Sequence, residues 1–260
     1  MKNLSEFQSK IEYVLTDIDD TMTNDGQLGS RAYDALWKLH DAGLKVIPIT
    51  GRPAGWCEMI ARFWPVAGVV GENGGLYFRH DKKMQRWFFS DEKTINENQT
   101  KLMKIKKQIL EQVPGSAVAS DQFCRMMDLA IDFCEDVTPL DKTAVNQIVA
   151  IFTQHGAQAK ISSIHVNGWF GDYDKVKTSF HVLKEQFQLD DSTILKKCVF
   201  IGDSPNDEPM FEKFLHSFGV ANIKNFSGQM KFLPQYISPS RGGDGFAEIA
   251  DRIIQAHITC

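Results

Sequence analysis

Three carboxylates within four positions follow a short apolar segment near the N-terminus. The apolar run spans residues 13–15 and is followed by Asp17, Asp19, Asp20 and Thr21. Burying several negative charges together is costly unless a cation or hydrogen-bond donors compensate them. The cluster therefore indicates either a cation site or a solvated acidic turn after an edge strand, and segments farther along the chain favour the cation site.

A second apolar segment also ends at acids. Residues 196–201 read as a buried strand, and Gly202, Asp203, Asn206 and Asp207 follow it. Carboxylates that converge on one point repel one another unless a hard dication lies among them. Oxygen ligands of this kind favour Mg²⁺, which commonly also takes an oxygen of a substrate phosphate.

Hydrogen-bond donors for an anion come from two other segments. Thr50, Gly51 and Arg52 follow the apolar strand 44–49, and Lys175 stands just before a predicted helix. A hydroxyl, backbone N–H groups and a helix N-terminus make an anion site, although Thr50 could also be a simple helix cap. A carboxylate nucleophile, a second carboxyl group, a metal and a lysine are what phosphoryl transfer requires.

The elements around these residues predict a parallel sheet. A strand at 13–15, a helix at 30–42 and a strand at 44–49 form a βαβ unit with a right-handed crossover. Open parallel sheets bind ligands at the carboxyl ends of their strands, so Thr50 and Asp17 should share one edge. The same texture returns near the C-terminus, with helices at 178–187, 209–214 and 245–257 and strands at 196–201 and 218–221.

The middle of the chain has a different pattern. Strands are predicted at 85–89, 123–133 and 160–166, with helices at 97–113 and 141–155. This is the pattern of a small α+β sheet covered by helices on one side. We expect it to be an inserted module at residues 81–167 in a core made of residues 1–80 and 168–260. Its uncovered face carries Asp128, Asp132, His165 and Asn167, which could contact a ligand or simply be wet.

A glycine-rich segment follows a third short strand at 66–70. Gly71 to Gly75 contains three glycines, which let the backbone adopt positive φ or approach a ligand closely. Asn73 would then lie at the same edge of the sheet as Thr50. The alternative is a plain hairpin turn into the apolar residues 76–78.

The composition excludes several classes of protein. The chain has 260 residues, 43% of them hydrophobic, and a net charge of −4, so no basic field indicates nucleic acid or an anionic membrane. No apolar run reaches the length of about 18 residues that spans a membrane, and the N-terminus lacks the apolar core of a signal peptide. The five cysteines form no CxxC pair, which predicts a cytoplasmic protein without disulfides or zinc. The sequence does not indicate an oligomeric state.

The four acidic and donor segments together resemble the motifs of the haloacid dehalogenase superfamily of Mg²⁺-dependent phosphatases. DxDxT is residues 17–21, the threonine after a strand is Thr50, the lysine at a helix start is Lys175, and GDxxxD begins at Gly202. The resemblance covers nearly the whole chain and implies a Rossmann-like α/β core with an inserted α+β cap. An insertion between the second and third motifs resembles subfamily IIB, as do the segments ENGG and GDSPND.

The resemblance also implies roles for the motif residues. Asp17 would be the nucleophile that forms an aspartyl phosphate, and Asp19 the general acid and base. Mg²⁺ would be held by Asp17, the backbone carbonyl of Asp19 and Asp203, with Asp207 in or just behind the ligand shell. The phosphoryl group would be bound by Thr50, Gly51, Lys175 and Asn206. Lys177 is the alternative to Lys175, because the usual Lys-Gly pair is absent here, and Asp20 replaces a usual glycine.

Subfamily IIB includes sucrose-phosphate, trehalose-phosphate and mannosylphosphoglycerate phosphatases, so the resemblance implies a small sugar phosphate as substrate. The cap would select the leaving group. Candidate substrate contacts are Asn73, Arg125, Asp128, Asp132, His165, Asn167 and Trp169. The alternatives are a phosphomutase of the same fold and a non-catalytic protein that binds sugar phosphates. The intact acids and Lys175 disfavour the second alternative, because a pure binder needs neither a nucleophile nor an acid.

Overall fold

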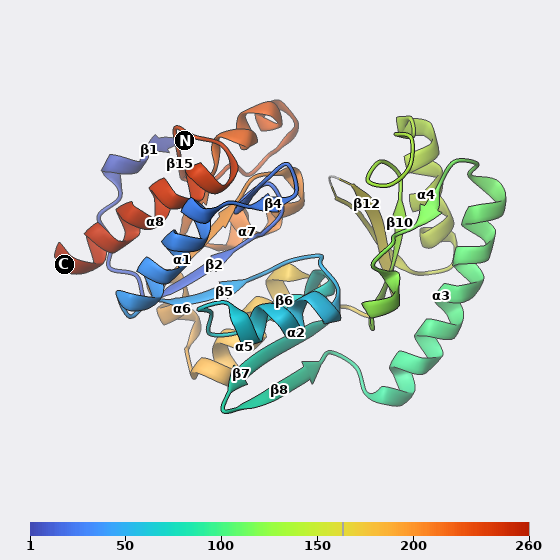
Figure 1. The fold of residues 1–260 in the computed structure, drawn as a ribbon, viewed down its shortest axis with the longest axis horizontal. Helices are drawn as coiled ribbons and strands as arrows, with labels where there is room; N and C mark the ends of the chain where they lie inside the picture. Colours follow the sequence, from blue (N-terminus) through green and yellow to red (C-terminus); the bar gives the residue numbers. More distant parts are fainter. Residues whose placement is uncertain (163, 260) are drawn as a thin grey trace.

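The computed structural model describes residues 1–162 and 164–259, and it has the α/β fold that the sequence predicts. A parallel six-stranded sheet forms the larger part of the molecule (Figure 1). Strand β2, which the first acidic cluster follows, is the fifth of the six strands and lies between β13 and β5. In sheet order, the strands are β1 (Lys2–Asn3), β15 (Tyr236–Ile237), β14 (His216–Gly219), β13 (Cys198–Gly202), β2 (Tyr13–Thr16) and β5 (Lys45–Pro48).

Helices cover both faces of this sheet, because alternate strand residues are apolar in both directions. In β2, Val14 belongs to one buried cluster and Leu15 to the other. The first cluster includes α1 (Ser30–Asp41), α2 (Ala54–Phe63) and α8 (Gly242–Thr259). The second includes α5 (Lys175–Phe187), α6 (Asp191–Lys197) and α7 (Glu208–Lys213). Helices α1 and α8 pack side by side on their face (Figure 1).

An antiparallel hairpin extends the core beyond β5. Strands β6 (Val69–Gly71), β7 (Leu76–Asp81) and β8 (Lys83–Phe88) form a three-stranded sheet, joined to β5 through a parallel bridge between Ile49 and Val70. The predicted boundary between residues 80 and 81 falls near the turn of this hairpin. Since β8 pairs with β7 from Lys83 to Phe88, the chain leaves the hairpin only after Phe88.

The middle of the chain forms the separate antiparallel sheet on the right of Figure 1. One face of this sheet packs on two helices through apolar side chains that include Ile131, Val166 and Ile148. Its strands are, in order, β11 (Gln158–Ile161), β12 (His165–Trp169), β10 (Asp128–Asp132) and β9 (Ala117–Val118), and its helices are α3 (Glu92–Gln112) and α4 (Lys142–Gln154).

Several elements differ from the sequence prediction. The strand expected at 123–133 begins only at Asp128, because residues 122–124 form a 3-10 turn in which Phe123 is 90% exposed. The strand expected at 160–166 is divided into β11 and β12, and Ser163 between them lies outside the described residues. Helix α6 and the short strands β1, β3 (Thr23–Asn24), β4 (Gln27–Leu28), β9 and β15 were not predicted. The other 3-10 turns are Leu4–Glu6, Glu72–Gly74, Pro205–Asp207, Ala221–Asn225 and Ser227–Gln229.

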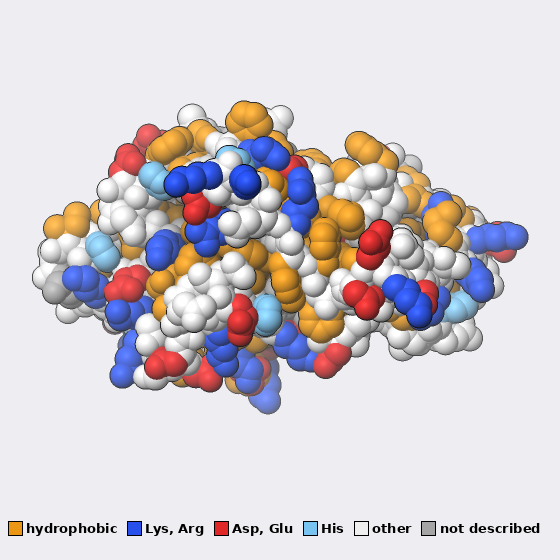
Figure 2. All heavy atoms as spheres, turned by 90° about the horizontal axis from the view of Figure 1, so that it is seen from below, with side chains coloured by type: hydrophobic (Ala, Val, Ile, Leu, Met, Phe, Trp, Pro, Cys, Tyr) orange, Lys and Arg blue, Asp and Glu red, His pale blue; other side chains and the backbone are white. Residues whose placement is uncertain are grey.

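Two features of the structure relate to the classes of protein that the composition excludes: the length of the apolar helices and the distribution of charge on the surface. Among the described residues, no helix is both long and apolar enough to cross a membrane. Figure 2 shows one face of the molecule, on which basic and acidic side chains are interspersed with hydrophobic ones. A mixed surface of this kind agrees with the net charge of −4.

Candidate active site

Three buried carboxylates meet at the carboxyl end of the parallel sheet. Asp17 follows β2, and Asp203 and Asp207 follow β13. One oxygen of each lies within 4.8 Å of an oxygen of the others. Because β2 and β13 are paired neighbours, the ends of two apolar strands bring together acids that lie almost 190 residues apart in the chain.

Lys175 is the cation of this cluster. Its Nζ donates to Asp17 Oδ1 at 2.7 Å and to Asp207 Oδ1 at 3.0 Å. Helix α5 begins at Lys175 because Asp174 caps it, accepting from the N–H of Lys177. The side chain of Lys177 is at the surface and pairs with Asp172. Of the two lysines considered from the sequence, Lys175 is therefore the one at the carboxylates.

The electrostatics of the cluster favour an added cation. Burial, together with the charges of Asp207 and Asp17, raises the pKa of Asp203 to about 9. Burial also raises the pKa of Asp17 to about 8, although Lys175 opposes the increase. One lysine thus does not balance the buried acids. The atoms that could coordinate a metal here are all carboxylate oxygens. A hard divalent cation prefers oxygen ligands, so these residues fit such an ion.

The loop after β13 is built around Asp207. The N–H of Asp203 donates to Asp207 Oδ2 at 3.0 Å, and a Cβ on Gly202 would come within 2.5 Å of the same oxygen. Only glycine allows the carboxylate to lie against the strand end. Thr21, from the first motif, donates to Asp203 Oδ1 at 3.3 Å and so joins the two acidic loops.

Asp19 faces the same cleft but has a different partner. Arg52 grips its carboxylate, with Nε to Oδ1 at 3.0 Å and Nη2 to Oδ1 at 2.8 Å. The guanidinium also lies 4.4 Å from the ring centre of Trp56. Arg52 is therefore held in place on two sides, and it fixes the orientation of Asp19. The sequence places Arg52 in the donor segment with Thr50 and Gly51, but it predicts no role for Arg52 at the site.

Donors for an anion surround Thr50. The Thr50 hydroxyl accepts from the N–H of Arg52 at 3.0 Å, and its carbonyl accepts from the N–H of Asn73 at 3.1 Å. Asn73 has a φ of +58°, a conformation that asparagine tolerates. Its buried Nδ2 has no hydrogen-bond partner among the described residues. The Asn73 amide, beside Gly51, is thus free to donate to a ligand.

The glycine-rich turn fixes Asn73 relative to Lys175. A Cβ on Gly74 would lie 2.4 Å from the carbonyl oxygen of Asp174, and the Thr178 hydroxyl donates to Gly74 at 2.7 Å. The turn therefore packs directly against the start of α5. A hairpin into β7 does follow, so the turn serves both the chain reversal and the placement of Asn73.

Glu72 of the same turn was not predicted as important. Its buried carboxylate accepts from the backbone N–H groups of Ala54, Met126, Met127 and Asp128, at 2.6 to 3.1 Å. It caps α2 and at the same time holds the segment leading into β10. Burial raises its pKa to about 8. Glu72 thus ties the inserted sheet to the core beside the cleft.

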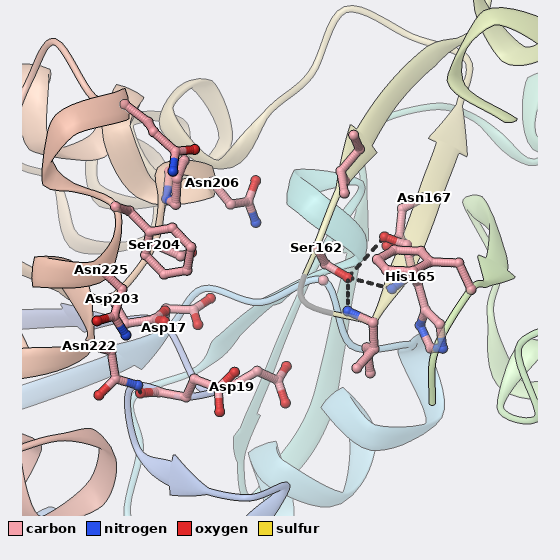
Figure 3. A pocket seen from close by; sticks show the side chains of 18 of the residues that line it. Asp17, Asp19, Ser162, His165, Asn167, Asp203, Ser204, Asn206, Asn222 and Asn225 are labelled. Atoms are coloured by element: carbon pink, nitrogen blue, oxygen red, sulfur yellow. Dashed lines mark hydrogen bonds between the residues drawn. The ribbon is translucent and has the colours of Figure 1, made fainter. Parts of the chain in front are cut away.

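The cleft between the two parts encloses a cavity of about 1270 Å³. Figure 3 shows its two sides facing each other. The core side presents Asp17, Asp19, Asp203, Asn206 and the unpredicted amides Asn222 and Asn225, whereas the other side presents Ser162, His165 and Asn167. The cavity is thus lined by acids at its base and by amide and hydroxyl groups around them.

The remaining predicted contacts on the inserted sheet bond mainly to one another. Arg125 donates to Asp121, to Asp128 and to the carbonyl of Gly51, and its side chain is 1% exposed. Asn167 donates to Asp128 Oδ2 at 3.0 Å. This part of the face is therefore not exposed to water, and Asp128 is fully buried. Asp128 meets its partners inside the protein, whereas Arg125 and Asn167 also line the cleft.

Asp132 lies outside the lining of the cleft. Its carboxylate accepts from the backbone N–H groups of Cys134, Glu135 and Asp136, and so it shapes the turn after β10. That turn places Glu135 beside His165, with 2.9 Å between Oε2 and Nε2, and 3.8 Å from Arg52. Burial lowers the pKa of His165. The position of Glu135 had no sequence signal, because it depends on this turn.

Trp169 is buried and stacks on Tyr173, with ring centres 5.6 Å apart. It lines a smaller cavity beside α5 and not the main cleft. Its packing is that of a residue at the return crossing from the inserted sheet to the core. A direct contact with a substrate in the main cleft is not what its position indicates.

Known proteins resemble this chain in sequence and in fold. Residues 14–119 match the haloacid dehalogenase-like hydrolase family. A phosphoglycolate phosphatase of Thermoplasma volcanium is 26% identical over 242 residues, covering 92% of this chain and 96% of that protein. The match therefore extends through the inserted part and the C-terminal part of the core.

Solved structures share the whole fold. The Thermoplasma acidophilum 0175 structure superposes with a TM-score of 0.74 at 20% identity, covering 95% of this chain and 99% of that chain. The sucrose-phosphatase of Synechocystis, solved with sucrose and phosphate, gives 0.65 at 15% identity, covering 94% and 98%. Residues 14–119 thus match the haloacid dehalogenase-like hydrolases, and the fold of the whole chain is the one that these solved structures have.

Proposed function

We propose that this enzyme is a Mg²⁺-dependent phosphatase that hydrolyses a small phosphate monoester through an aspartyl phosphate on Asp17. The observation that carries the proposal is the cluster of Asp17, Asp203 and Asp207, in which Lys175 forms ion pairs with Asp17 and Asp207. Three buried acids and one lysine leave negative charge uncompensated. A divalent cation would balance that charge, and the phosphate that it also binds would have its phosphorus beside the Asp17 carboxylate.

In this proposal, Asp17 attacks phosphorus and the leaving oxygen departs on the opposite side. Asp19, held by Arg52, protonates that oxygen and then takes a proton from the water that cleaves the aspartyl phosphate. Lys175, the Thr50 hydroxyl, the backbone at Gly51 and the amides of Asn73 and Asn206 are the donors for the phosphoryl oxygens. Mg²⁺ would be held by Asp17, Asp203, Asp207 and the carbonyl of Asp19, and when bound it supplies positive charge against the phosphate.

The cleft suits a leaving group rich in hydroxyl groups. Amide and hydroxyl side chains from both sides of the cavity, such as Asn222, Asn225 and Ser162, offer donors and acceptors together. A cavity of about 1270 Å³ exceeds what a two-carbon acid requires. The sugar-binding structural neighbour supports a sugar phosphate, whereas the name of the Thermoplasma relative supports a small phosphorylated acid.

We further propose that residues 81–167 act as a cap that selects the leaving group, over a core of residues 1–80 and 168–260. Strand β8 at the start of this segment pairs with the core hairpin, so the sheet and helices of the cap begin at α3. The contacts of Glu72 and Arg125 tie the two parts together beside the cleft. Buried free thiols at Cys57 and Cys198 support the proposed cytoplasmic location.

The test is the replacement Asp17→Asn with p-nitrophenyl phosphate and with a panel of sugar phosphates. We expect metal-dependent hydrolysis to fall by on the order of 10⁴-fold or more, as when an enzyme loses its nucleophile. The matched control is Asp34→Asn, which removes an exposed acid on α1 and should leave turnover intact. Full activity of the Asp17 variant would refute the nucleophile. A sugar phosphate that is isomerised without release of free phosphate would instead identify a phosphomutase.

A further inference from the structure

The basic side chains around the cleft differ in one respect, which is whether an acid already neutralises them. Four are ion-paired within the protein, namely Arg52, Arg125, Lys175 and Arg241. Two have no ion pair in the described part of the chain, namely Lys142 and Lys160. Lys142 is exposed at the start of α4, whereas Lys160 is partly buried. Lys160 is therefore the cation whose charge is both sheltered from water and uncompensated.

The register of the cap sheet places Lys160 on the face toward the core. In the β11–β12 ladder, Lys160 lies opposite Asn167, so both side chains project from the same face of the sheet. Asn167 lines the main cavity. Lys160 lines a second cavity of about 180 Å³, together with Lys175, Asn73 and Asn206. Asn73 and Asn206 line both cavities, so the small one adjoins the phosphate donors.

In the part of the chain that the structure describes, no acid lies within ion-pair distance of Lys160. Burial lowers the pKa of its ammonium group, and the charge of Lys175 lowers it further. Asp174, Asp207 and Glu208 act in the opposite direction from farther away, and none of them forms an ion pair with Lys160. Asp174 caps α5 and Asp207 is bonded to Lys175, so both are already engaged. The small cavity thus contains an ammonium group without an ion pair, although Asp172 and Asp174 also line it, and an anionic group bound there would pair with that ammonium.

We propose that Lys160 is a specificity-determining residue that binds a second anionic group, a carboxylate or a phosphate, on the leaving group of the substrate. The proposal rests on the proposed phosphatase function and narrows its substrate class. While the reacting phosphoryl group occupies the donors around Lys175, the second anion reaches the small cavity and pairs with the Lys160 ammonium. Phosphorylated hydroxy acids and sugar bisphosphates have this chemistry, and neutral sugar monophosphates lack it.

The test compares substrates that differ in this second charge. Phosphoglycolate and fructose bisphosphate carry it on a carboxylate and on a phosphate, respectively, whereas glucose phosphate and p-nitrophenyl phosphate lack it. For the unaltered enzyme, kcat/KM should be higher for at least one of the doubly anionic substrates. In Lys160→Gln, the ratio of kcat/KM for that substrate to kcat/KM for glucose phosphate should fall by about 10- to 100-fold, the usual effect of losing a charged hydrogen bond. The loss should appear in KM, and Lys160→Arg should recover most of it.

Lys142→Gln tests the other unpaired cap lysine, which is exposed and lines the main cavity. Lys104→Gln is the matched control, because Lys104 is an exposed cap lysine on α3 that lines neither cavity. Its ratio should equal that of the unaltered enzyme. Equal losses on all four substrates in Lys160→Gln would overturn the proposal, as would a ratio that changes in Lys142→Gln instead. Calorimetry on Asp17→Asn, with and without the second substitution Lys160→Gln, measures binding apart from turnover. If the two variants had the same affinity for phosphoglycolate and also the same affinity for fructose bisphosphate, the proposal would be overturned. An unaltered enzyme that hydrolyses no monoester would remove the proposed function itself, whereas hydrolysis with an unchanged ratio would remove only the role of Lys160.

Discussion

The core and the cap each contain a cluster of buried carboxylates, yet the two clusters differ in what satisfies them. In the cap, Asp128 is bonded to Arg125 and Asn167, and Asp132 is bonded to three backbone N–H groups. In the core, Lys175 contacts Asp17 and Asp207, while Asp203 accepts only from the Thr21 hydroxyl among the described side chains. The cap cluster is complete within the protein, and the core cluster is not.

This difference separates structural acids from acids available to a ligand. Burying a charge is tolerated when donors surround it, and then the group contributes to the fold. Where donors are lacking, the group needs a positive charge from outside the protein, here a cation. Residue type and burial alone do not distinguish the two cases. The count of donors around each oxygen does, and it predicts opposite consequences for similar substitutions.

The largest effect is expected for Lys175→Met, which removes the cation from the core cluster. Asp17 and Asp207 would remain buried without their partner, and breaking such a pair costs about 3–5 kcal/mol of stability. Turnover should fall by roughly 10²- to 10³-fold, as when a donor to the developing charge is lost. Urea unfolding without metal and phosphatase assays with metal measure the two effects.

Lys177→Met is the control for this change, since Lys177 lies two residues away and pairs with Asp172 at the surface. It should alter stability by less than about 1 kcal/mol, the usual limit for an exposed ion pair. If Lys177→Met were the inactive variant and Lys175→Met the active one, the assignment of the phosphate-binding lysine would be reversed.

The core site could be predicted from the sequence because its residues follow the ends of strands. Parallel strands with apolar sequences must lie in the sheet, and their carboxyl ends must share an edge, so Asp17, Thr50 and Asp203 were bound to converge. Arg52 directly follows Thr50 and Gly51, and Glu72 directly precedes Asn73, so both lie in segments that the sequence already singles out. Their partners, Asp19 for the first and four backbone N–H groups for the second, depend on distances that no sequence pattern contains.

The cap was predicted less well for a related reason. Alternation identified the core-facing side of β10 and β12, but not whether acids there meet water, a ligand or each other. Arg125 precedes β10 in a turn and bends back to Asp128, and Lys160 is paired with Asn167 only because the chain reverses after β11. The pattern of residues 160–166 predicts a single strand, and a single strand does not contain the β11–β12 ladder that places Lys160.

A smaller effect that sharpens the comparison is the response to pH and metal. Because burial and the neighbouring acids raise the pKa values of Asp17 to about 8 and of Asp203 to about 9, the folded metal-free protein binds more protons than the unfolded chain above about pH 4. Stability without metal should therefore decrease as the pH rises from about 4 toward 8 or 9. Mg²⁺ should counter the decrease, and its apparent affinity should rise over the same range as protons leave. Thermal unfolding over this range, with Mg²⁺ or with a chelator, measures both.

Asp203→Asn provides the check on this response. The variant should lose metal-dependent turnover and most of the stabilisation by Mg²⁺, yet unfold without metal at a temperature no lower than that of the unaltered protein at neutral pH. The reason is that, with a pKa of about 9, Asp203 must take up a proton at neutral pH when the metal-free protein folds, and a neutral amide avoids this cost. A metal-free variant that is clearly less stable would mean that the Asp203 carboxylate is already satisfied by the protein.

The smallest effect is expected for the matching substitution in the cap, Asp132→Asn. The amide retains one acceptor oxygen but turns an NH₂ group toward N–H donors that the carboxylate now satisfies. Unfolding free energy should fall by about 1–2 kcal/mol, as for a lost buried hydrogen bond. Stabilisation by Mg²⁺ should match that of the unaltered protein, because Asp132 lies outside the lining of the cleft. A loss of metal response in this variant would mean that the carboxylates of the cap and of the core are electrostatically coupled. A loss of stability without a loss of metal response would show that the Asp132 carboxylate stabilises the fold. The same substitution at Asp203 should show the reverse, because that carboxylate is available to a ligand.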